Sequence, residues 1–309
     1  MVVDVVRMLS ALLLTLGLVL IDTAVPSALS PHTDAPSHHV RDGFRNVAPD
    51  YAYPLIGRAL RTLRLGFEHA PARGRTPAVL TNDGAELRAN GMVPTLTWIG
   101  HSTFLLQIDS VNILTDPHWG DRASPVMFTG PRRLVPPGMR FEDLPPIHAV
   151  IISHDHYDHL DEATVRRLNA AYHPTFFVPL GIKAWLAKVG ITNVVELDWW
   201  ETREFRGLTL VCTPAQHSFG ERLGPFDVAF IPIGGYSAYE RHPNHVNPEE
   251  AVQIFEDLGA RLMVPMHFGT FDLNREPFRE PPDRLMREAL RRGLEESVAL
   301  LSPGQTIHW

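Results

Sequence analysis

The sequence predicts an α/β protein in which strands and helices alternate along most of the chain. Short runs of β-branched and aromatic residues, bounded by Gly, Pro, Asn or Asp, recur from residue 95 onward, a pattern typical of strands. Helix start and stop residues separate several of these runs; Asn247 and Pro248 begin one helix and Gly259 ends it. The 309 residues are enough for one large α/β domain or two modest ones.

The elements are expected in the following order. Strands are expected at 95–99, 104–108, 111–115, 149–152, 175–178, 193–197, 208–212, 228–233, 262–265 and near 298–301. Helices are expected at 162–170, 182–189, 248–258 and about 284–292. A Pro-, Gly- and Arg-rich loop runs from Asp116 to about Pro146, and loops of that length in a compact domain are usually functional.

The N-terminal 90 residues differ from the rest. Residues 1–25 contain Arg7 followed by 14 uncharged, largely apolar residues, the layout of a secretory signal peptide, which predicts export to the periplasm or outside the cell. An uncleaved membrane anchor is the alternative. Residues 26–90 are interpreted as an extension, in which 54–64 could form a short helix with an Arg-rich face turned to solvent or to a membrane surface. Residues 91–309 form the expected main domain.

Composition excludes several classes of protein. The formal net charge is −7 and no stripe is dense in Lys or Arg, so a nucleic acid is not an expected partner. The single cysteine, Cys212, permits neither an internal disulfide nor a cysteine-based metal site.

The loop 153–161 predicts a metal site. It reads Ser-His-Asp-His-Tyr-Asp-His-Leu-Asp and follows the expected strand 149–152. Imidazole nitrogens and carboxylate oxygens are the usual ligands of a catalytic zinc, and a strand-to-helix loop can direct them inward. His217 and His267 each follow another expected strand, and together with this loop they would complete two sites of three ligands, each with a position left for water.

These motifs resemble the metallo-β-lactamase superfamily. Its zinc loop is similar to 153–161, and further motifs resemble the branch that contains the phospholipase D hydrolysing N-acylphosphatidylethanolamine. These motifs are 97–103 (Thr-Trp-Ile-Gly-His-Ser-Thr), 114–117 (Leu-Thr-Asp-Pro), 122–125 (Arg-Ala-Ser-Pro), 245–251 (His-Val-Asn-Pro-Glu-Glu-Ala) and 267–271 (His-Phe-Gly-Thr-Phe). The resemblance covers roughly 45–309 and implies a four-layer αβ/βα sandwich.

The resemblance also implies roles for individual residues. One zinc would be held by His154, His156 and His217, and a second by Asp158, His159 and His267. Asp158 and His245 are the expected catalytic residues, with His245 contacting a phosphate oxygen or assisting proton transfer. Asp116 would orient the zinc loop.

One part of the family pattern is missing. The family has two further strands after the position of His217, which carry an aspartate that bridges the zinc ions, whereas here only 218–226 precede Asp227 and the next strand. We therefore expect a sandwich lacking two strands, one or two zinc ions, and weak binding of the second. The histidines of the first site would suffice for a mononuclear catalyst.

Several other polar residues are assigned no part in metal binding. His101 is expected to be structural, and His118 and His242 to face solvent. Arg132 and Arg133 either pair with a phosphate or are solvated.

The expected function is a zinc-dependent hydrolase that cleaves a phosphodiester of a small molecule or a phospholipid of the N-acylphosphatidylethanolamine type, by metal-activated hydroxide. Because the metal site alone does not choose phosphorus over carbon, a lactonase or other ester hydrolase is an alternative. A catalytically impaired zinc-binding relic is another. A nuclease is disfavoured by the acidic charge balance.

Overall fold

The computed structural model describes residues 38–40, 43–44, 78–126, 128–213, 226–236, 245–271, 273 and 276–309. Contacts between residues divide the chain into two units, Met1–Pro71 and Ala72–Trp309. In the first unit, β1 (His39–Val40) pairs with β2 (Gly43–Phe44) as a short antiparallel hairpin. The expected signal peptide and the expected helix 54–64 lie outside the described residues. Among the described helices, none has the length and apolar character needed to span a bilayer.

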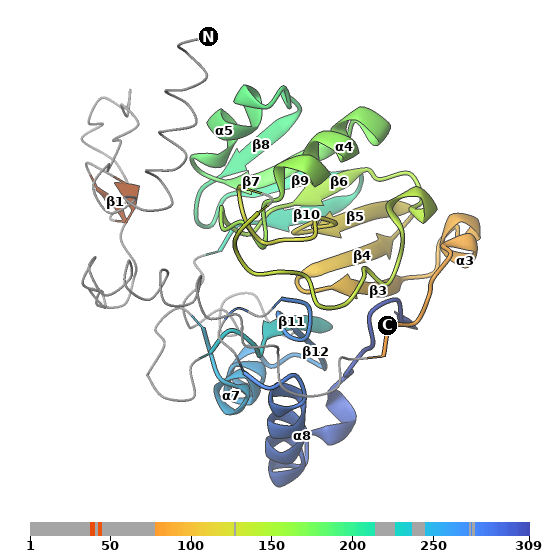
Figure 1. Cartoon of the computed structure of the whole chain (residues 1–309), viewed down its shortest axis with the longest axis vertical. Coiled ribbons are helices and arrows are strands. Elements are labelled where there is room, and N and C mark those ends of the chain that lie inside the picture. Colours follow the sequence, from red (N-terminus) through yellow and green to blue (C-terminus); the bar gives the residue numbers. More distant parts are fainter. Residues whose placement is uncertain are drawn as a thin grey trace. The chain divides into compact units, whose positions relative to one another are not determined.

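The second unit is built around a seven-stranded sheet of order β13-β3-β4-β5-β6-β7-β8 (Figure 1). Its strands β3, β4 and β5 are antiparallel, as is the pair β13–β3, whereas β5 to β8 run parallel. The strands are β3 (Thr95–Gly100), β4 (Thr103–Ile108), β5 (Val111–Thr115), β6 (Ala149–Ile151), β7 (Thr175–Pro179), β8 (Val194–Leu197) and β13 (Thr306–His308).

Two helices cover one face of this sheet. They are α4 (Glu162–Tyr172) and α5 (Ile182–Lys188), whose buried Val165, Leu168 and Leu186 pack against strand residues such as Val150 and Phe176. Asp161 caps α4, because its side chain accepts a hydrogen bond from the Thr164 backbone N–H. The cap fixes α4 directly after the loop 153–161, which positions the loop at the end of β6.

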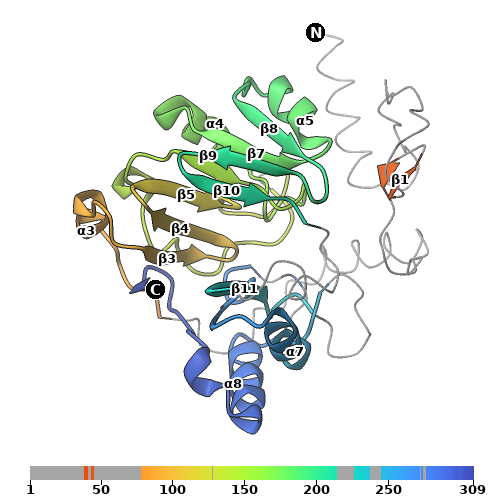
Figure 2. The same cartoon turned by 180° about the vertical axis from the view of Figure 1, so that it is seen from behind.

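The opposite face carries two further pairs of strands. The antiparallel hairpin β9 (Thr202–Phe205) and β10 (Leu208–Val211) covers the parallel strands (Figure 2). The parallel pair β11 (Val228–Pro232) and β12 (Leu262–Met266) packs on β3 and β4 through Trp98 and Phe104.

Two helices complete the fold on the far side of β11 and β12. They are α7 (Pro248–Leu258) and α8 (Glu280–Arg292), which pack on each other and on β11–β12 (Figure 1). Asn247 and Glu250 form a capping box at the start of α7. The layers are therefore helix, sheet, sheet and helix, and the predicted αβ/βα sandwich is confirmed. Short elements complete the second unit: α3 (Ala85–Ala89), the 3₁₀ turns Phe141–Asp143 and Glu295–Ser297.

The structure differs from the expected elements in three places. Residues 298–301 form a single bridge, between Val298 and Met263, rather than a strand. The last strand is β13 instead, because Gly304 donates its N–H to the Trp98 carbonyl and brings the C-terminal residues beside β3. The strand β9 was not expected, since its sequence Thr-Arg-Glu-Phe lacks an apolar run. The last helix begins at Glu280 rather than about Arg284, despite Pro281 and Pro282, because proline is tolerated in the first helical turn.

Among the described residues, the sheet formed by β11 and β12 has only these two strands. Residues 214–225, where the family pattern is shortened, lie outside the described part of the chain.

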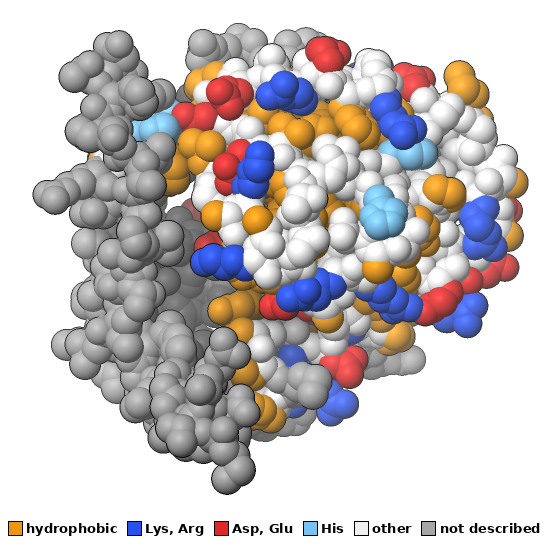
Figure 3. Space-filling model, turned by 90° about the horizontal axis from the view of Figure 1, so that it is seen from above, with side chains coloured by type: hydrophobic (Ala, Val, Ile, Leu, Met, Phe, Trp, Pro, Cys, Tyr) orange, Lys and Arg blue, Asp and Glu red, His pale blue; other side chains and the backbone are white. Residues whose placement is uncertain are grey.

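Figure 3 shows one face of the molecule, on which acidic and basic side chains are interspersed and form no basic stripe.

Candidate metal centre

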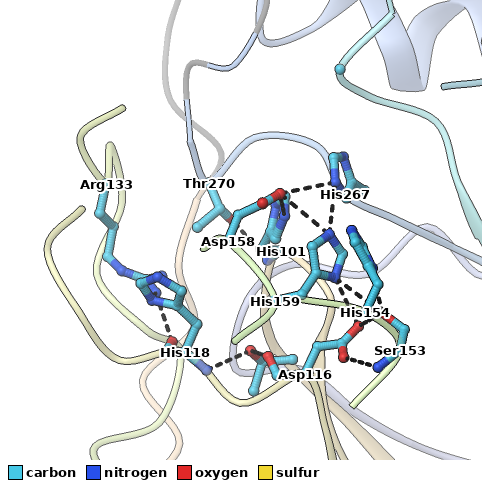
Figure 4. Close-up of polar contacts among 12 residues, drawn as sticks. His101, Asp116, His118, Arg133, Ser153, His154, Asp158, His159, His267 and Thr270 are labelled. Carbon is cyan, nitrogen blue, oxygen red and sulfur yellow. Dashed lines mark hydrogen bonds and ion pairs between the residues drawn. The ribbon is translucent and has the colours of Figure 1, made fainter. Parts of the chain in front are cut away.

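Buried histidines and aspartates from four separate segments meet where several strands end (Figure 4). His101 lies in the β3–β4 turn, Asp116 follows β5, the loop 153–161 follows β6, and His267 follows β12. The sheets bring together residues from distant parts of the chain because these turns and strand ends lie at one edge of the sandwich.

Three ligand-type atoms converge at the centre of this group. His159 Nε2 and His267 Nε2 are 3.1 Å apart, and each lies 3.2 Å from Asp158 Oδ2. All three side chains are buried. Zinc–ligand distances of about 2 Å place the ligands of a tetrahedral site about 3.3 Å from one another.

These donors therefore fit a divalent cation. Two imidazole nitrogens at this separation repel each other unless a proton or a cation lies between them, and a buried carboxylate requires a positive partner. The donor set of two nitrogens and one oxygen matches catalytic zinc sites.

Asp116 braces the loop that carries two of these donors. Its Oδ2 accepts a hydrogen bond from His159 Nδ1 at 2.8 Å and from Ser153 Oγ at 2.7 Å, and its Oδ1 accepts from the Ser153 backbone N–H at 2.7 Å. Since Nδ1 of His159 donates to Asp116, Nε2 is left to bind a metal. The structure thus gives Asp116 the contacts that the expected orienting role requires.

His154 and His156 lie beside the buried donors but are more accessible. The His154 ring centroid is 4.1 Å from that of His159 and 4.5 Å from that of His156. His154 is partly buried, with Nδ1 2.9 Å from Ser153 Oγ, and His156 is exposed. Their expected partner at the first zinc, His217, lies outside the described residues.

His245 lies next to His267. Their ring centroids are 5.1 Å apart, and a Cβ atom on Gly235 would lie only 2.9 Å from His245 Nδ1 and 3.3 Å from His267 Cε1. Gly235 has φ 78°, and its backbone N–H donates to Glu276 Oε1 at 2.6 Å. The absence of a side chain at residue 235 therefore leaves room for both rings.

His101, which the sequence indicated as structural, belongs to this buried group. Its Nε2 lies 2.9 Å from Asp158 Oδ2, and its ring centroid is 4.1 Å from that of His267. The sequence offered one signal, a histidine directly after a buried strand, but the pairing with Asp158 depends on the register between the loop 153–161 and the β3–β4 turn.

Burial and hydrogen bonding shift several pKa values in the metal-free protein. Burial alone would raise the pKa of Asp158, but hydrogen bonds from His101, His159 and His267 outweigh it and hold that pKa well below its usual range. Burial likewise opposes the charged form of His159, yet its bonds to Asp116 and Asp158 raise its pKa to about 9. Burial and the neighbouring histidines lower the pKa of His154 to about 4.

Three site residues adopt a left-handed backbone that is uncommon for residues other than glycine. They are His101 (φ 54°), Asp116 (φ 36°) and His267 (φ 65°). Such strain persists where the surrounding contacts fix it, and it concentrates at functional sites.

Two expectations about residues near the centre were wrong. His118 does not face solvent: it is buried, and burial lowers its pKa to about 4. Arg133 is partly buried and donates to the carbonyl oxygens of His118 (2.7 Å) and Gly120 (2.9 Å) while it packs over the Phe271 ring. It is therefore not the solvated surface arginine that the sequence allowed. Arg132 is exposed, and His242 lies outside the described residues.

Comparison with known proteins agrees with this geometry. Residues 111–221 and 218–268 match the family described as the beta-lactamase superfamily domain. An uncharacterized protein of Mycobacterium tuberculosis is 36% identical over 88% of this chain and 84% of its own length. The N-acyl-phosphatidylethanolamine-hydrolyzing phospholipase D 1 of Caenorhabditis elegans is 37% identical over 61% of this chain and 68% of its own.

The fold has relatives among solved structures as well. A metallo hydrolase from the archaeon Ignicoccus hospitalis superposes with a TM-score of 0.54 at 22% identity, over 71% of this chain and 99% of that one. Fold and site together define a metal-dependent hydrolase. The chain belongs to the metallo-β-lactamase superfamily, and it resembles the branch of the N-acylphosphatidylethanolamine phospholipases D.

Proposed function

We propose that this chain is a zinc-dependent hydrolase that cleaves a phosphodiester bond in a phospholipid of the N-acylphosphatidylethanolamine type. The observation that carries the metal-dependent part is the convergence of Asp158 Oδ2, His159 Nε2 and His267 Nε2 within 3.2 Å of one another. The relative in Caenorhabditis elegans supports the choice of substrate class.

The donor chemistry supports zinc. Asp158, His159 and His267 would hold one ion, and His154 and His156 would contribute to a second. Zinc in such a site supplies Lewis acidity and a nucleophilic water near neutral pH.

The other residues of the site orient a metal ligand or bind the substrate. Asp116 accepts a hydrogen bond from Nδ1–H of His159 and so favours the tautomer in which the unprotonated Nε2 faces the centre. His245, whose ring lies 5.1 Å from that of His267, is placed to contact a phosphoryl oxygen or to give a proton to the leaving group. Its partly buried position lets it reach a substrate at the edge of the centre.

The N-terminal segment extends the proposal to location. Residues 1–25 would direct export or anchor the protein at a membrane, which would bring the site near phospholipid. Fractionation of cells that express the full chain, with and without these residues, tests this. Equal recovery of both forms from the cytosol would contradict it.

Turnover by the purified, zinc-loaded full chain tests the activity. We expect hydrolysis of bis(p-nitrophenyl) phosphate and of N-acylphosphatidylethanolamine, and at least a hundredfold loss in His154→Ala. His308→Ala, in the exposed end of β13, is the matched control and should retain the wild-type rate.

Three other outcomes would redirect the proposal. Hydrolysis of lactones or carboxylic esters without phosphodiesters would indicate a lactonase or esterase. Bound zinc without any turnover would indicate a relic that binds metal, in keeping with the single carboxylate in the buried cluster of the described residues. A rate unchanged in His154→Ala would point to a contaminating enzyme.

A further inference from the structure

We propose that His101 is a positioning residue of the metal centre, which holds the Asp158 carboxylate where a cation can bind it. The inference rests on the proposed metal centre and adds to it a residue from the β3–β4 turn, a segment that contributes no other group to the site. Asp116 fixes the His159 ligand through a hydrogen bond at 2.8 Å, and His101 would do the same for the Asp158 ligand.

The side chain of His101 has one polar partner. Its Nε2 lies 2.9 Å from Asp158 Oδ2, whereas its buried Nδ1 has no hydrogen-bond partner among the described residues. A neutral imidazole carries one N–H, and a buried N–H without an acceptor is costly, so the proton belongs on Nε2. His101 therefore donates to Asp158.

The ring has little freedom to leave this position. It is buried, with 1% of its surface exposed, and its centroid lies 4.1 Å from that of His267 and 5.2 Å from that of Phe271. Packing therefore keeps His101 next to Asp158, in addition to the hydrogen bond (Figure 4).

The backbone of His101 holds a second metal ligand. Its carbonyl accepts the His267 backbone N–H at 3.2 Å, and its own N–H donates to Thr270 Oγ1 at 2.7 Å. The left-handed φ of 54° lets the turn present the backbone and the ring to the centre at the same time. One residue thereby sets the distance between Asp158 and His267, which come from opposite sheets of the sandwich.

Two other roles for His101 make different predictions. As a filler of the core, it would affect folding stability but not metal affinity. As a direct ligand, it would alter the coordination of the bound ion. A positioning residue changes affinity and leaves the coordination sphere intact, typically at a cost of about 10- to 100-fold in affinity.

The test uses the full chain, stripped of metal, with zinc affinity measured by competition against a chelator and coordination read from the visible spectrum of bound Co²⁺. We expect His101→Phe to weaken zinc binding by about 10- to 100-fold. His101→Gln, whose amide N–H can still donate to Asp158, should lose less. At saturation both variants should keep the Co²⁺ band positions of the wild type.

His118→Gln is the control, because His118 is as buried as His101 and also contacts Phe271, but makes no hydrogen bond with the converging donors. It should keep the wild-type zinc affinity even if the protein becomes less stable. Circular dichroism of the metal-free proteins checks that each variant is folded, and His101→Asn, with an amide too short to reach Asp158, replaces the Phe variant if that one does not fold.

Wild-type zinc affinity in His101→Phe or its Asn replacement would overturn the inference in favour of a filler role. Shifted Co²⁺ bands in His101→Gln would overturn it in favour of a direct ligand. A wild-type protein that bound neither ion would overturn the proposed metal centre itself, and the inference with it.

Discussion

The Asp116 carboxylate lies 2.8 Å from Nδ1 of His159 and so fixes which nitrogen of that ring faces the centre. The same carboxylate also accepts two hydrogen bonds from Ser153, at the start of the metal loop. One strand-end residue therefore orients both a ligand and the backbone that carries it.

Replacement of Asp116 by Asn should weaken zinc binding by about 10- to 100-fold, because an amide is a poorer acceptor for Nδ1–H and can offer its own N–H in the wrong direction. Asp109→Asn, in the exposed β4–β5 turn at a φ of 47°, is the matched control and should bind zinc normally. Chelator competition measures both. Equal zinc affinities in the two variants would show that the hydrogen bond to Asp116 does not orient His159 for metal binding.

Gly235 should tolerate no side chain. A Cβ there would lie 2.9 Å from His245 Nδ1 and 3.3 Å from His267 Cε1, so Gly235→Ala should displace one ring and reduce turnover at least tenfold. Gly190→Ala is the matched control: its φ of 85° is as unfavourable for alanine as the 78° of Gly235, but nothing lies within 4 Å of the new atom.

Both alanine variants should therefore lose about 1–2 kcal/mol of stability to backbone strain, and only Gly235→Ala should lose activity. Thermal unfolding and turnover of bis(p-nitrophenyl) phosphate separate the two effects. An equal loss of activity in both would mean that strain alone explains it.

The layered fold could be predicted from sequence because its signals are local. Asn247, Pro248 and Gly259 mark the ends of α7, and apolar runs mark the strands of the main sheet. The strand β9 could not be predicted from sequence, because it has no apolar run. The position of β13 could not be predicted either, because it depends on how Gly304 brings the chain back to β3.

The residues of the site likewise divide into those that the sequence predicts and those that it does not. The sequence of the metal loop is distinctive, because three histidines and two aspartates lie within six residues. By contrast, the buried environments of His101 and His118 depend on which turns meet across the sandwich, and a single histidine carries no sign of that. The use of the Arg133 guanidinium on carbonyl oxygens likewise appears only when the long loop is folded back over Phe271.

Metal-free protein should lose stability as the pH rises from about 6.5 through about 9. The pKa of His159 is raised to about 9 from an ordinary 6.5, because its bonds to Asp116 and Asp158 outweigh burial. The protonated ring thus stabilises the fold fully below pH 6.5, and that contribution, on the order of 3 kcal/mol, disappears as His159 deprotonates.

Urea unfolding of the chelator-treated protein at several pH values measures this. His159→Gln should reduce the decline in the free energy of unfolding between pH 7 and 9.5. The lowered pKa values of His101 and His154 act in the opposite sense and remove stability as the pH falls below about 6.5, so the metal-free protein should be most stable near neutrality. A stability that rose steadily to pH 9.5 would contradict the assignment of a proton to His159.

Zinc should bind tightly at Asp158, His159 and His267 and more weakly at the site of His154 and His156. The sequence favoured the opposite order, since a missing bridging aspartate weakens the second site of the family. In the structure, however, the first three side chains are buried, lie within 3.2 Å of one another and are braced by Asp116, whereas His156 is exposed. Preorganised ligands lose less conformational freedom on binding, which favours the buried set.

Stepwise removal of zinc with increasing chelator, followed by metal analysis, reveals the order. The first ion should leave without much change in the unfolding temperature, and removal of the second should lower it clearly, because an ion at 100 times its Kd stabilises the folded state by about 2.7 kcal/mol. His267→Ala should lose the tight ion and His154→Ala the weak one. If His154→Ala instead removed the tightly held ion, the three-histidine site would be the principal one.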